Sequence, residues 1–279
     1  MWNIAWTGFV SLPEVTMNRT VLLALSLAIA ISAAALADDW SKTFQISGHP
    51  DLRVNANDGS VTVRTWDRKE IEARVTTVRW RIPTEVQVVE HQSGDHVELE
   101  VHMPHRMFSL NFGQRSSIQV ELRVPREIRS DIRTGDGSIV VENLRGETRL
   151  STGDGRIEAT SMDGTLDAQT GDGRIITRGR FDLLNLHTGD GSIEAEINNG
   201  SRMTSEWSVR TGDGHVTLRL PANLSADLDV HTGDGHIQSD LPVTVSGSRN
   251  EHELRGKLNS GGPPLIVRTN DGSIRLERM

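Results

Sequence analysis

The chain has 279 residues, a formal net charge of −8 and no cysteine. The lack of cysteine excludes disulfides, thiolate metal sites and a cysteine nucleophile. An acidic balance argues against nucleic acid as a partner, because phosphates attract basic proteins. Aromatic residues make up only 4% of the chain, although sugar-binding sites usually present exposed aromatic rings.

Residues 1–37 have the layout of a secretory signal peptide. Met17 and Arg19 supply a start and a positive charge, residues 21–36 are apolar or small, and Ala35-Leu36-Ala37 is a small-x-small cleavage signal. The first 16 residues look like an upstream extension, so we expect the true start at Met17. An uncleaved anchor is the alternative, although the run is shorter than the roughly 20 residues that span a bilayer. The sequence predicts export to the periplasm, the cell surface or the medium, with no membrane span after cleavage.

Residues 38–130 alternate apolar and polar side chains without a strict repeat. The stretch 51–65 surrounds Asn57-Asp58-Gly59 and resembles an early coil, and the stretch 103–117 has the composition of a loop. Longer predicted strands are Ile71 to Trp80, Val86 to His91, Val97 to His102 and Ile118 to Val124. They indicate either a small sheet domain or wide first coils that cap the repeats that follow.

Residues 131–279 are organised around the tetrapeptide Thr-Gly-Asp-Gly, which occurs six times. Each copy is followed by one polar residue and then Ile or Val, and the aspartates are spaced 18, 18, 18, 23 and 21 residues apart. Related Asn-Asp-Gly copies hold Asp58 and Asp271. A nearly fixed period of this length is typical of repeat architectures.

Short alternating segments flank each motif, which leaves room for about two strands and two turns per repeat. One such unit cannot bury its apolar face alone, whereas stacking pairs each strand with its counterpart about 4.8 Å away. The sequence predicts an all-β, single-chain β-solenoid with coils of roughly 18–23 residues and a β-rich cap at 38–130. We expect the motifs to line one edge, and their inward threonines to form a hydrogen-bonded ladder.

Two positions of the motif carry conformational information. The second is Gly or Asn, the residues that most readily take a positive φ, so we expect a left-handed residue there and a tight turn at the Asp-Gly that follows. The fourth position is Gly in every copy, which predicts that a side chain there would clash or strain the backbone.

Insertions interrupt the repeat at 198–207 and 221–226, and a polar loop is expected at 246–264 before the last copy closes the stack. In solenoids such insertions often gather on a binding face. Candidate surface contacts are Trp207, Arg202, His215 and His236. For Trp207 the favoured interpretation is a half-buried ring that caps the core. His215 and His236 hold the same position in copies that follow one another, and His187 and His231 share another position that would pair them if their coils stack closely.

The motif aspartates would lie about 5 Å apart in a stack, which is unfavourable for like charges. Each could accept N–H bonds within its own turn and point to solvent, or Ca²⁺ could bridge them. The calcium candidates are Asp136, Asp154, Asp172, Asp190, Asp213 and Asp234. Further alternatives are a transition metal between stacked histidines, and copper at the group His102, His105 and Met107. No other cofactor is expected.

The export signal, the alternating N-terminal strands and the Thr-Gly-Asp-Gly-x-Ile unit over about residues 45–279 resemble the bacterial putative-adhesin family. The resemblance implies a β-strand-repeat domain of unknown function, a β-solenoid fold and a surface or envelope location. The long step from Asp58 to Asp136 departs from a uniform repeat. The family defines no functional residues that could be carried over.

No catalytic constellation stands out, because a ladder of equivalent carboxylates lacks the unlike pair that a glycosidase needs. We therefore expect a non-enzymatic exported module, adhesive, structural or scaffolding, whose partner is an envelope protein or a surface glycan. A carbohydrate-binding or polysaccharide-cleaving β-helix is the alternative, and a regulatory envelope protein is a third possibility.

Overall fold

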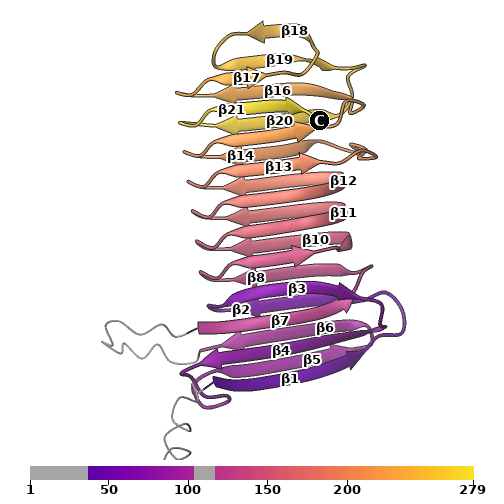
Figure 1. The fold of residues 1–279 in the computed structure, drawn as a ribbon, viewed down its shortest axis with the longest axis vertical. Coiled ribbons are helices and arrows are strands. Elements are labelled where there is room, and N and C mark those ends of the chain that lie inside the picture. Colours follow the sequence, from indigo (N-terminus) through magenta and orange to yellow (C-terminus); the bar gives the residue numbers. More distant parts are fainter. Residues whose placement is uncertain (1–36, 104–116) are drawn as a thin grey trace, which may run out of the picture. The chain divides into compact units, whose positions relative to one another are not determined.

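The computed structural model describes residues 37–103 and 117–279, and Ala37–Met279 form one compact unit made of β-strands (Figure 1). The predicted all-β class is confirmed. The predicted signal peptide lies outside the described residues except for Ala37, which begins the first strand. The interior of the predicted loop at 103–117 also lies outside them, together with His105 and Met107.

The described residues contain 21 strands. In chain order they are β1 (Ala37–Gln45), β2 (Asp51–Ala56), β3 (Ser60–Trp66), β4 (Glu70–Val78), β5 (Gln87–Ser93), β6 (His96–His102), β7 (Ser117–Pro125), β8 (Arg129–Thr134), β9 (Ile139–Glu142), β10 (Arg145–Thr152), β11 (Ile157–Thr170), β12 (Ile175–Thr188), β13 (Ile193–Ile197), β14 (Trp207–Thr211), β15 (Val216–Leu220), β16 (Ala226–Thr232), β17 (Ile237–Ser239), β18 (Val243–Arg249), β19 (Glu253–Leu258), β20 (Pro264–Thr269) and β21 (Ile274–Arg278). The strands predicted between residues 71 and 124 are all present, with shifts of a few residues at their ends.

The strands form two stacked rows joined at the motifs. The entry face holds the strands that lead into a motif and, at its two ends, four further strands; its spatial order is β5, β6, β2, β8, β10, β11, β12, β14, β20, β16, β19 and β18. The exit face holds the strands that leave a motif and, at its N-terminal end, β1, β4 and β7; its order is β1, β4, β7, β3, β9, β11, β12, β13, β15, β21 and β17. Strands β11 and β12 run around the opposite corner, so each contributes to both faces.

Parallel pairing in register explains the repeat period. Ile157 pairs with Ile175, and Ile175 pairs with Ile193, so equivalent residues recur in steps of 18. Between the faces, alternate side chains point inward and form one apolar core, whose largest buried members are Trp207, Phe44 and Phe181. Full burial of one such isoleucine stabilises the fold by roughly 1.5–3 kcal/mol relative to exposure, so each added coil extends the same core.

The long sequence step between Asp58 and Asp136 does not interrupt the stack. Strands β2 and β3 form a coil around Asn57-Asp58-Gly59, and this coil pairs in parallel with β8 and β9. Strands β6 and β7 extend the two faces by a further pair of parallel strands. Beyond them β5, β4 and β1 are antiparallel, so this end of the stack differs in pairing from the motif coils.

The spatial order of the last coils differs from their sequence order. Strand β20 lies between β14 and β16, and β21 lies between β15 and β17. The prediction that the last motif copy closes the stack was therefore wrong, because β16 to β19 lie beyond it. Part of the predicted polar loop at 246–264 instead forms β18 and β19, which pair antiparallel and extend the entry face from β16. Leu254 and Leu258 of β19 are buried, so that strand also contributes to the core.

Candidate interaction surface

The motif threonines link neighbouring coils through backbone groups. The Thr170 hydroxyl lies 2.9 Å from the carbonyl oxygen of Gly155 in the preceding coil, and it accepts a 3.2 Å bond from the Gly173 N–H of its own motif. Thr188 repeats this arrangement with Gly173 and Gly191. All six motif threonines are buried. The predicted ladder is present, and its partners are backbone groups rather than other threonines.

The motif glycines are required by close approach of the next coil. A Cβ on Gly153 would lie 2.8 Å from the carbonyl oxygen of Gly135, and a Cβ on Gly155 would overlap that of Gly137. The predicted clash at the fourth position is thus confirmed. The predicted left-handed conformation at the second position was wrong, because no second-position residue of the eight copies has a positive φ. The Asp-Gly step is a bend without a backbone turn hydrogen bond, and in copies such as those of Thr170 and Thr188 the threonine hydroxyl accepts the Gly N–H instead.

The six motif aspartates, Asp136 to Asp234, point to solvent along one edge. Their side chains are exposed, and within the described residues none of them accepts a hydrogen bond. The expectation that backbone N–H groups of the turn hold them was therefore wrong, whereas the expectation that the charges point to solvent is confirmed. Across residues 37–103 and 117–279, no three histidine, aspartate or glutamate side chains are grouped to hold a metal ion. Calcium binding stays a prediction.

The candidate histidine pairs are not neighbours. Ser273 of the intercalated coil lies between His215 and His236: its N–H donates to His215 Nδ1 at 3.1 Å, and its Oγ lies 3.1 Å from His236 Nδ1. Arginines of β14 and β20 likewise separate His187 from His231. The stacked pairs expected from sequence order were wrong, because the C-terminal coil enters the stack between them.

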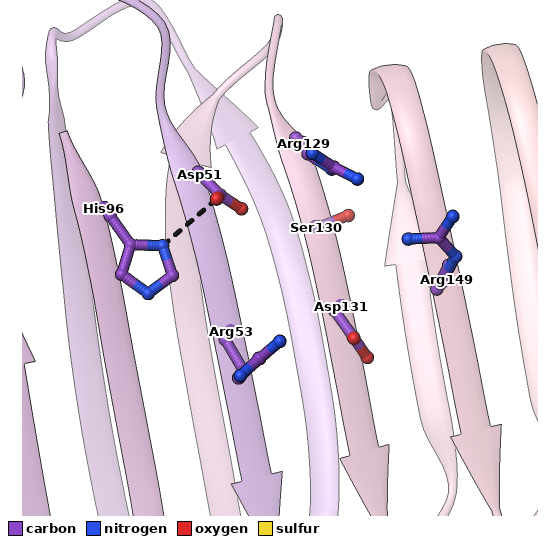
Figure 2. A pocket seen from close by; sticks show the side chains of 7 residues that line it. All are labelled: Asp51, Arg53, His96, Arg129, Ser130, Asp131 and Arg149. Atoms are coloured by element: carbon purple, nitrogen blue, oxygen red, sulfur yellow. Dashed lines mark hydrogen bonds and ion pairs between the residues drawn. The ribbon is translucent and has the colours of Figure 1, made fainter.

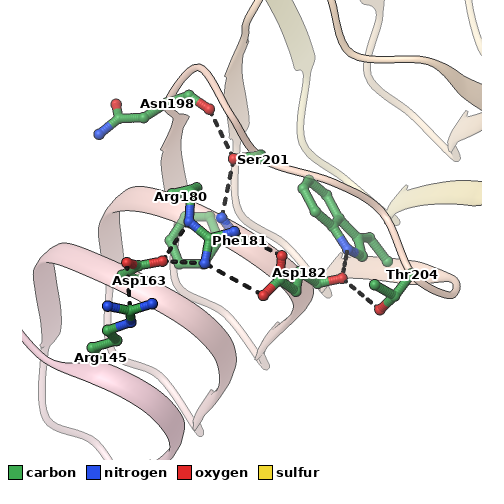
Figure 3. Close-up of polar contacts among 9 residues, drawn as sticks. Arg145, Asp163, Arg180, Phe181, Asp182, Asn198, Ser201 and Thr204 are labelled. Carbon is green, nitrogen blue, oxygen red and sulfur yellow. Dashed lines mark hydrogen bonds and ion pairs between the residues drawn. The ribbon is translucent and has the colours of Figure 1, made fainter. Parts of the chain in front are cut away.

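The insertion at 198–207 is fastened to the core (Figure 3). Trp207 is fully buried, and its Nε1 donates to the carbonyl oxygen of Asp182 at 3.2 Å. The Thr204 hydroxyl donates to the same oxygen at 3.0 Å, and Ser201 Oγ accepts from the Phe181 N–H at 3.0 Å. The favoured position of Trp207 in the core is confirmed, although the ring is fully and not half buried, and its candidacy as a surface contact was wrong. Arg202 is exposed and stays a candidate contact.

An arginine holds the corner beside this insertion (Figure 3). Arg180 Nη1 lies 2.8 Å from Asp182 Oδ1, and its guanidinium also contacts Asp163 of the preceding coil. Hydrogen bonding to Asp182, together with Asp163, raises the pKa of Arg180. Arg145 approaches Asp163 from the other side at 3.7 Å. The side chains of three successive coils are thereby connected, which fits a structural role.

The most distinctive surface lies on the entry face over β6, β2, β8 and β10, which Figure 2 shows in part. Its outward charges alternate in sign along β2, β8 and β10 and between these strands, and Glu98 of β6 extends the alternation opposite Arg53. We call it the checkerboard face, and its members are His96, Glu98, Asp51, Arg53, Arg129, Asp131, Glu147 and Arg149. The sequence analysis did not predict this surface, although the charged residues at alternate positions of these strands could have indicated it.

A hollow of about 150 Å³ lies within the checkerboard face (Figure 2). His96 Nδ1 lies 3.1 Å from Asp51 Oδ2 at one side, and Arg149 lies 2.7 Å from Glu147 Oε1 at the other. Ser130 lines the hollow with its hydroxyl 3.3 Å from that of buried Thr148. The arginines here are roughly half exposed and their carboxylate partners less so, and exposed ion pairs are worth about 0–1 kcal/mol each. A charged partner could therefore replace one member of such an ion pair at a small cost in free energy.

A family profile described as Toastrack DUF4097 matches residues 126–277. This chain belongs to the Toastrack DUF4097 family. The Toastrack region covers the six Thr-Gly-Asp-Gly coils and the intercalated C-terminal coil, while β1 to β7 precede it. The checkerboard face spans both parts, with β8 and β10 inside the Toastrack region and β2 and β6 outside it. No curated protein matches the chain.

Several solved structures are similar to this Toastrack chain at low identity. A putative cell adhesion protein from Clostridium sporogenes is 13% identical, with a TM-score of 0.42 over 87% of this chain and 100% of that chain. A putative adhesin from Bacteroides fragilis is 12% identical, with a TM-score of 0.45 over 86% and 97%. A putative lipid binding protein from Parabacteroides distasonis is 10% identical, with a TM-score of 0.41 over 86% and 96%.

Ion pairs also bridge coils on the exit face of the Toastrack region. Glu194 lies 2.7 Å from Arg219 and 2.8 Å from Arg174, and Arg219 reaches Glu277 at 2.9 Å. Hydrogen bonding to Arg219, with further help from Arg174, lowers the pKa of Glu194 below its usual range. These contacts repeat one kind of interaction from coil to coil.

In the part of the chain that the structure describes, no helix is long and apolar enough to cross a membrane.

Proposed function

We propose that this chain is an exported, non-enzymatic module of a bacterial envelope that adheres to a charged surface glycan through its checkerboard face. The observation that carries the proposal is the regular alternation of opposite charges over four neighbouring strands. An enzyme needs unlike polar groups that converge on one point, whereas this face repeats equivalent groups. Export rests on the signal-like residues 1–37, with the periplasm, the cell surface or the medium as destination.

Binding would proceed by exchange of ion pairs. Arg53 lies 3.8 Å from Glu98, and Arg129 lies 3.4 Å from Glu147, which are loose contacts between half-exposed arginines and glutamates that are 30% and 36% exposed. A partner that carries charges at the strand spacing of about 4.8 Å could take over several such contacts at once. The attraction would weaken in high salt, because exposed charges are screened within about 8–10 Å at physiological ionic strength.

The test is a glycan and polysaccharide binding screen on the chain without residues 1–36, scored for retention and for depolymerisation, with and without Ca²⁺. We expect retention without cleavage, and at least a tenfold loss of affinity in the double variant Arg53→Gln/Arg149→Gln. The matched control is Arg178→Gln/Arg275→Gln, which removes two similarly exposed arginines from the exit face and should bind normally. Equal loss in both variants would contradict the assignment to the checkerboard face.

The main alternative is a carbohydrate-cleaving β-helix, and the hollow beside Asp51, His96 and Asp131 is the observation that favours it. Depolymerisation in the same screen would establish that alternative and overturn the non-enzymatic proposal. Retention of envelope proteins with no glycan bound would replace the glycan by a protein partner. Retention that requires Ca²⁺ would support cation binding by the motif aspartates.

A further inference from the structure

The C-terminal coil, residues 264–278, is intercalated between two coils that are consecutive in sequence. Strands β15 and β16 are joined by residues 221–225 alone, yet a whole coil separates their layers. Figure 1 shows β20 and β21 inside the stack and not at its end. The fold therefore contains a gap, one coil deep, that a later part of the chain fills.

The contacts in this gap are those of an ordinary repeat. Leu265, Val267, Ile274 and Leu276 are buried in the core. Below the coil, Thr269 donates to the Gly214 carbonyl oxygen at 2.9 Å. Above it, the Gly272 carbonyl oxygen accepts from the Thr232 hydroxyl at 2.7 Å. None of these contacts depends on which copy of the chain supplies the coil.

One short connection joins the C-terminal coil to the rest of the described chain. It comprises residues 259–263, Asn-Ser-Gly-Gly-Pro, in which Asn259 and Gly261 have φ values of 55° and 74°. Extended, five residues reach about 17 Å. Glycines in such a connection can straighten without steric cost, so the coil can be carried away from its own gap.

We propose that the C-terminal coil is exchanged between copies of this chain, so that the coil of one copy fills the gap of a second copy. Exchange of an identical element preserves every contact of the coil and loses only those of the connection, such as the 2.6 Å bond from Asn259 to the Leu224 oxygen, so it is a low-cost route to dimers. The closed monomer is favoured while the effective concentration of the tethered coil exceeds that of free chains. Raising the chain concentration during folding shifts the balance towards exchange. This inference goes beyond the proposed function and does not depend on it.

Because the chain has no cysteine, any disulfide in a variant must form between the introduced cysteines. Ser208 of β14 and Ile266 of β20 are register partners, and both side chains lie on the outer surface of the entry face. Cα atoms of paired residues fall within the 4.4–6.8 Å range that a disulfide needs. The double variant Ser208→Cys/Ile266→Cys should close within one chain after folding at low concentration, which establishes the register on which the exchange depends.

Two single variants with different affinity tags, Ser208→Cys and Ile266→Cys, are then unfolded, mixed, refolded together and oxidised. We expect a dimer that carries both tags, with a yield that rises several-fold when the refolding concentration is raised tenfold. The control mixes Glu158→Cys with Ile176→Cys, register partners in central coils that are continuous with the chain on both sides. This control should give no dimer above the random background.

The proposal is overturned if the mixed dimer stays at the control level at every concentration while the double variant closes. Failure of the double variant to close would also overturn it, because the assigned register would then be wrong. If refolding is inefficient, the two tagged variants are co-expressed and purified together, and the same comparison with the control decides the outcome.

Discussion

Replacing Gly173 by alanine tests whether close approach of coils explains the motif. A Cβ at this position would overlap the carbonyl oxygen of Gly155 and lie 2.7 Å from the Thr170 hydroxyl. Neither atom can yield easily, because the Gly155 oxygen already accepts the Thr170 hydroxyl bond and both flanking strands are paired on two sides. The coil must therefore shift as a unit or lose its contacts.

The expected cost follows from these contacts. Forcing extra volume into a packed site costs typically 1–3 kcal/mol. Displacing the Thr170 hydroxyl also weakens its bonds to the Gly155 oxygen and the Gly173 N–H, each worth about 1 kcal/mol. We expect Gly173→Ala to lower the free energy of unfolding by about 3–5 kcal/mol, a sum of these two principles.

The measurement is urea unfolding followed by Trp fluorescence and by circular dichroism, because repeat proteins can lose two-state behaviour. The control is Gly171→Ala, whose Cβ would lie 2.7 Å from the Gly153 oxygen on the exposed edge. The stack already accepts a side chain at this position in Asn270, where the N···O contact to the neighbouring coil is 2.7 Å instead of the 2.5 Å seen at Gly171. We expect about 1–2 kcal/mol for the control by the same overpacking argument. Equal costs for both variants would refute the reasoning.

Three further outcomes are expected. Thr188→Val leaves the buried Gly173 oxygen without its 2.9 Å partner and should cost about 1–3 kcal/mol in urea unfolding, whereas Thr188→Ser should recover most of it; equal losses would contradict the ladder. Trp207→Phe removes the bond to the Asp182 oxygen and shrinks a fully buried ring, so it should cost about 2–4 kcal/mol without changing glycan retention; lost retention at unchanged stability would restore Trp207 as a contact. The lowered pKa of Glu194 contributes stability above the ordinary glutamate pKa, and this is lost as the pH falls through the lowered value. Glu194→Gln should therefore be less stable at pH 7 by under about 1 kcal/mol, with a difference that shrinks at pH 3; a constant difference would argue against the ion pair.

The sequence alone predicted the all-β repeat, the common edge of the motifs and the inward threonines. These features repeat in every copy, and period-two alternation reports burial directly. The strands between residues 71 and 124 were predicted for the same reason. Close approach at Gly155 was also predictable, since only glycine occupies that position in all copies.

The order of the last coils could not be predicted, because each motif copy offers the same pairing surface to any other. Sequence proximity favoured β16 next to β14, whereas β20 takes that place. The error about His215 and His236 follows from this one misplacement. The second motif glycine was misinterpreted for another reason: glycine and asparagine suit positive φ, and the close backbone contact that selects Gly153 involves a residue 18 positions away.

In-register stacking has a consequence for how the length of such a chain can change. In the central coils, residues 157, 175 and 193 occupy equivalent places in successive layers. If a block of 18 residues were duplicated or deleted there, each remaining coil would still stack on a coil with equivalent residues in register. Gene duplication could therefore lengthen the molecule one layer at a time. The same operation near residue 221 would disturb the layer that the C-terminal coil completes. Duplication can thus lengthen the middle of the molecule, whereas the coils after residue 220 do not accept it.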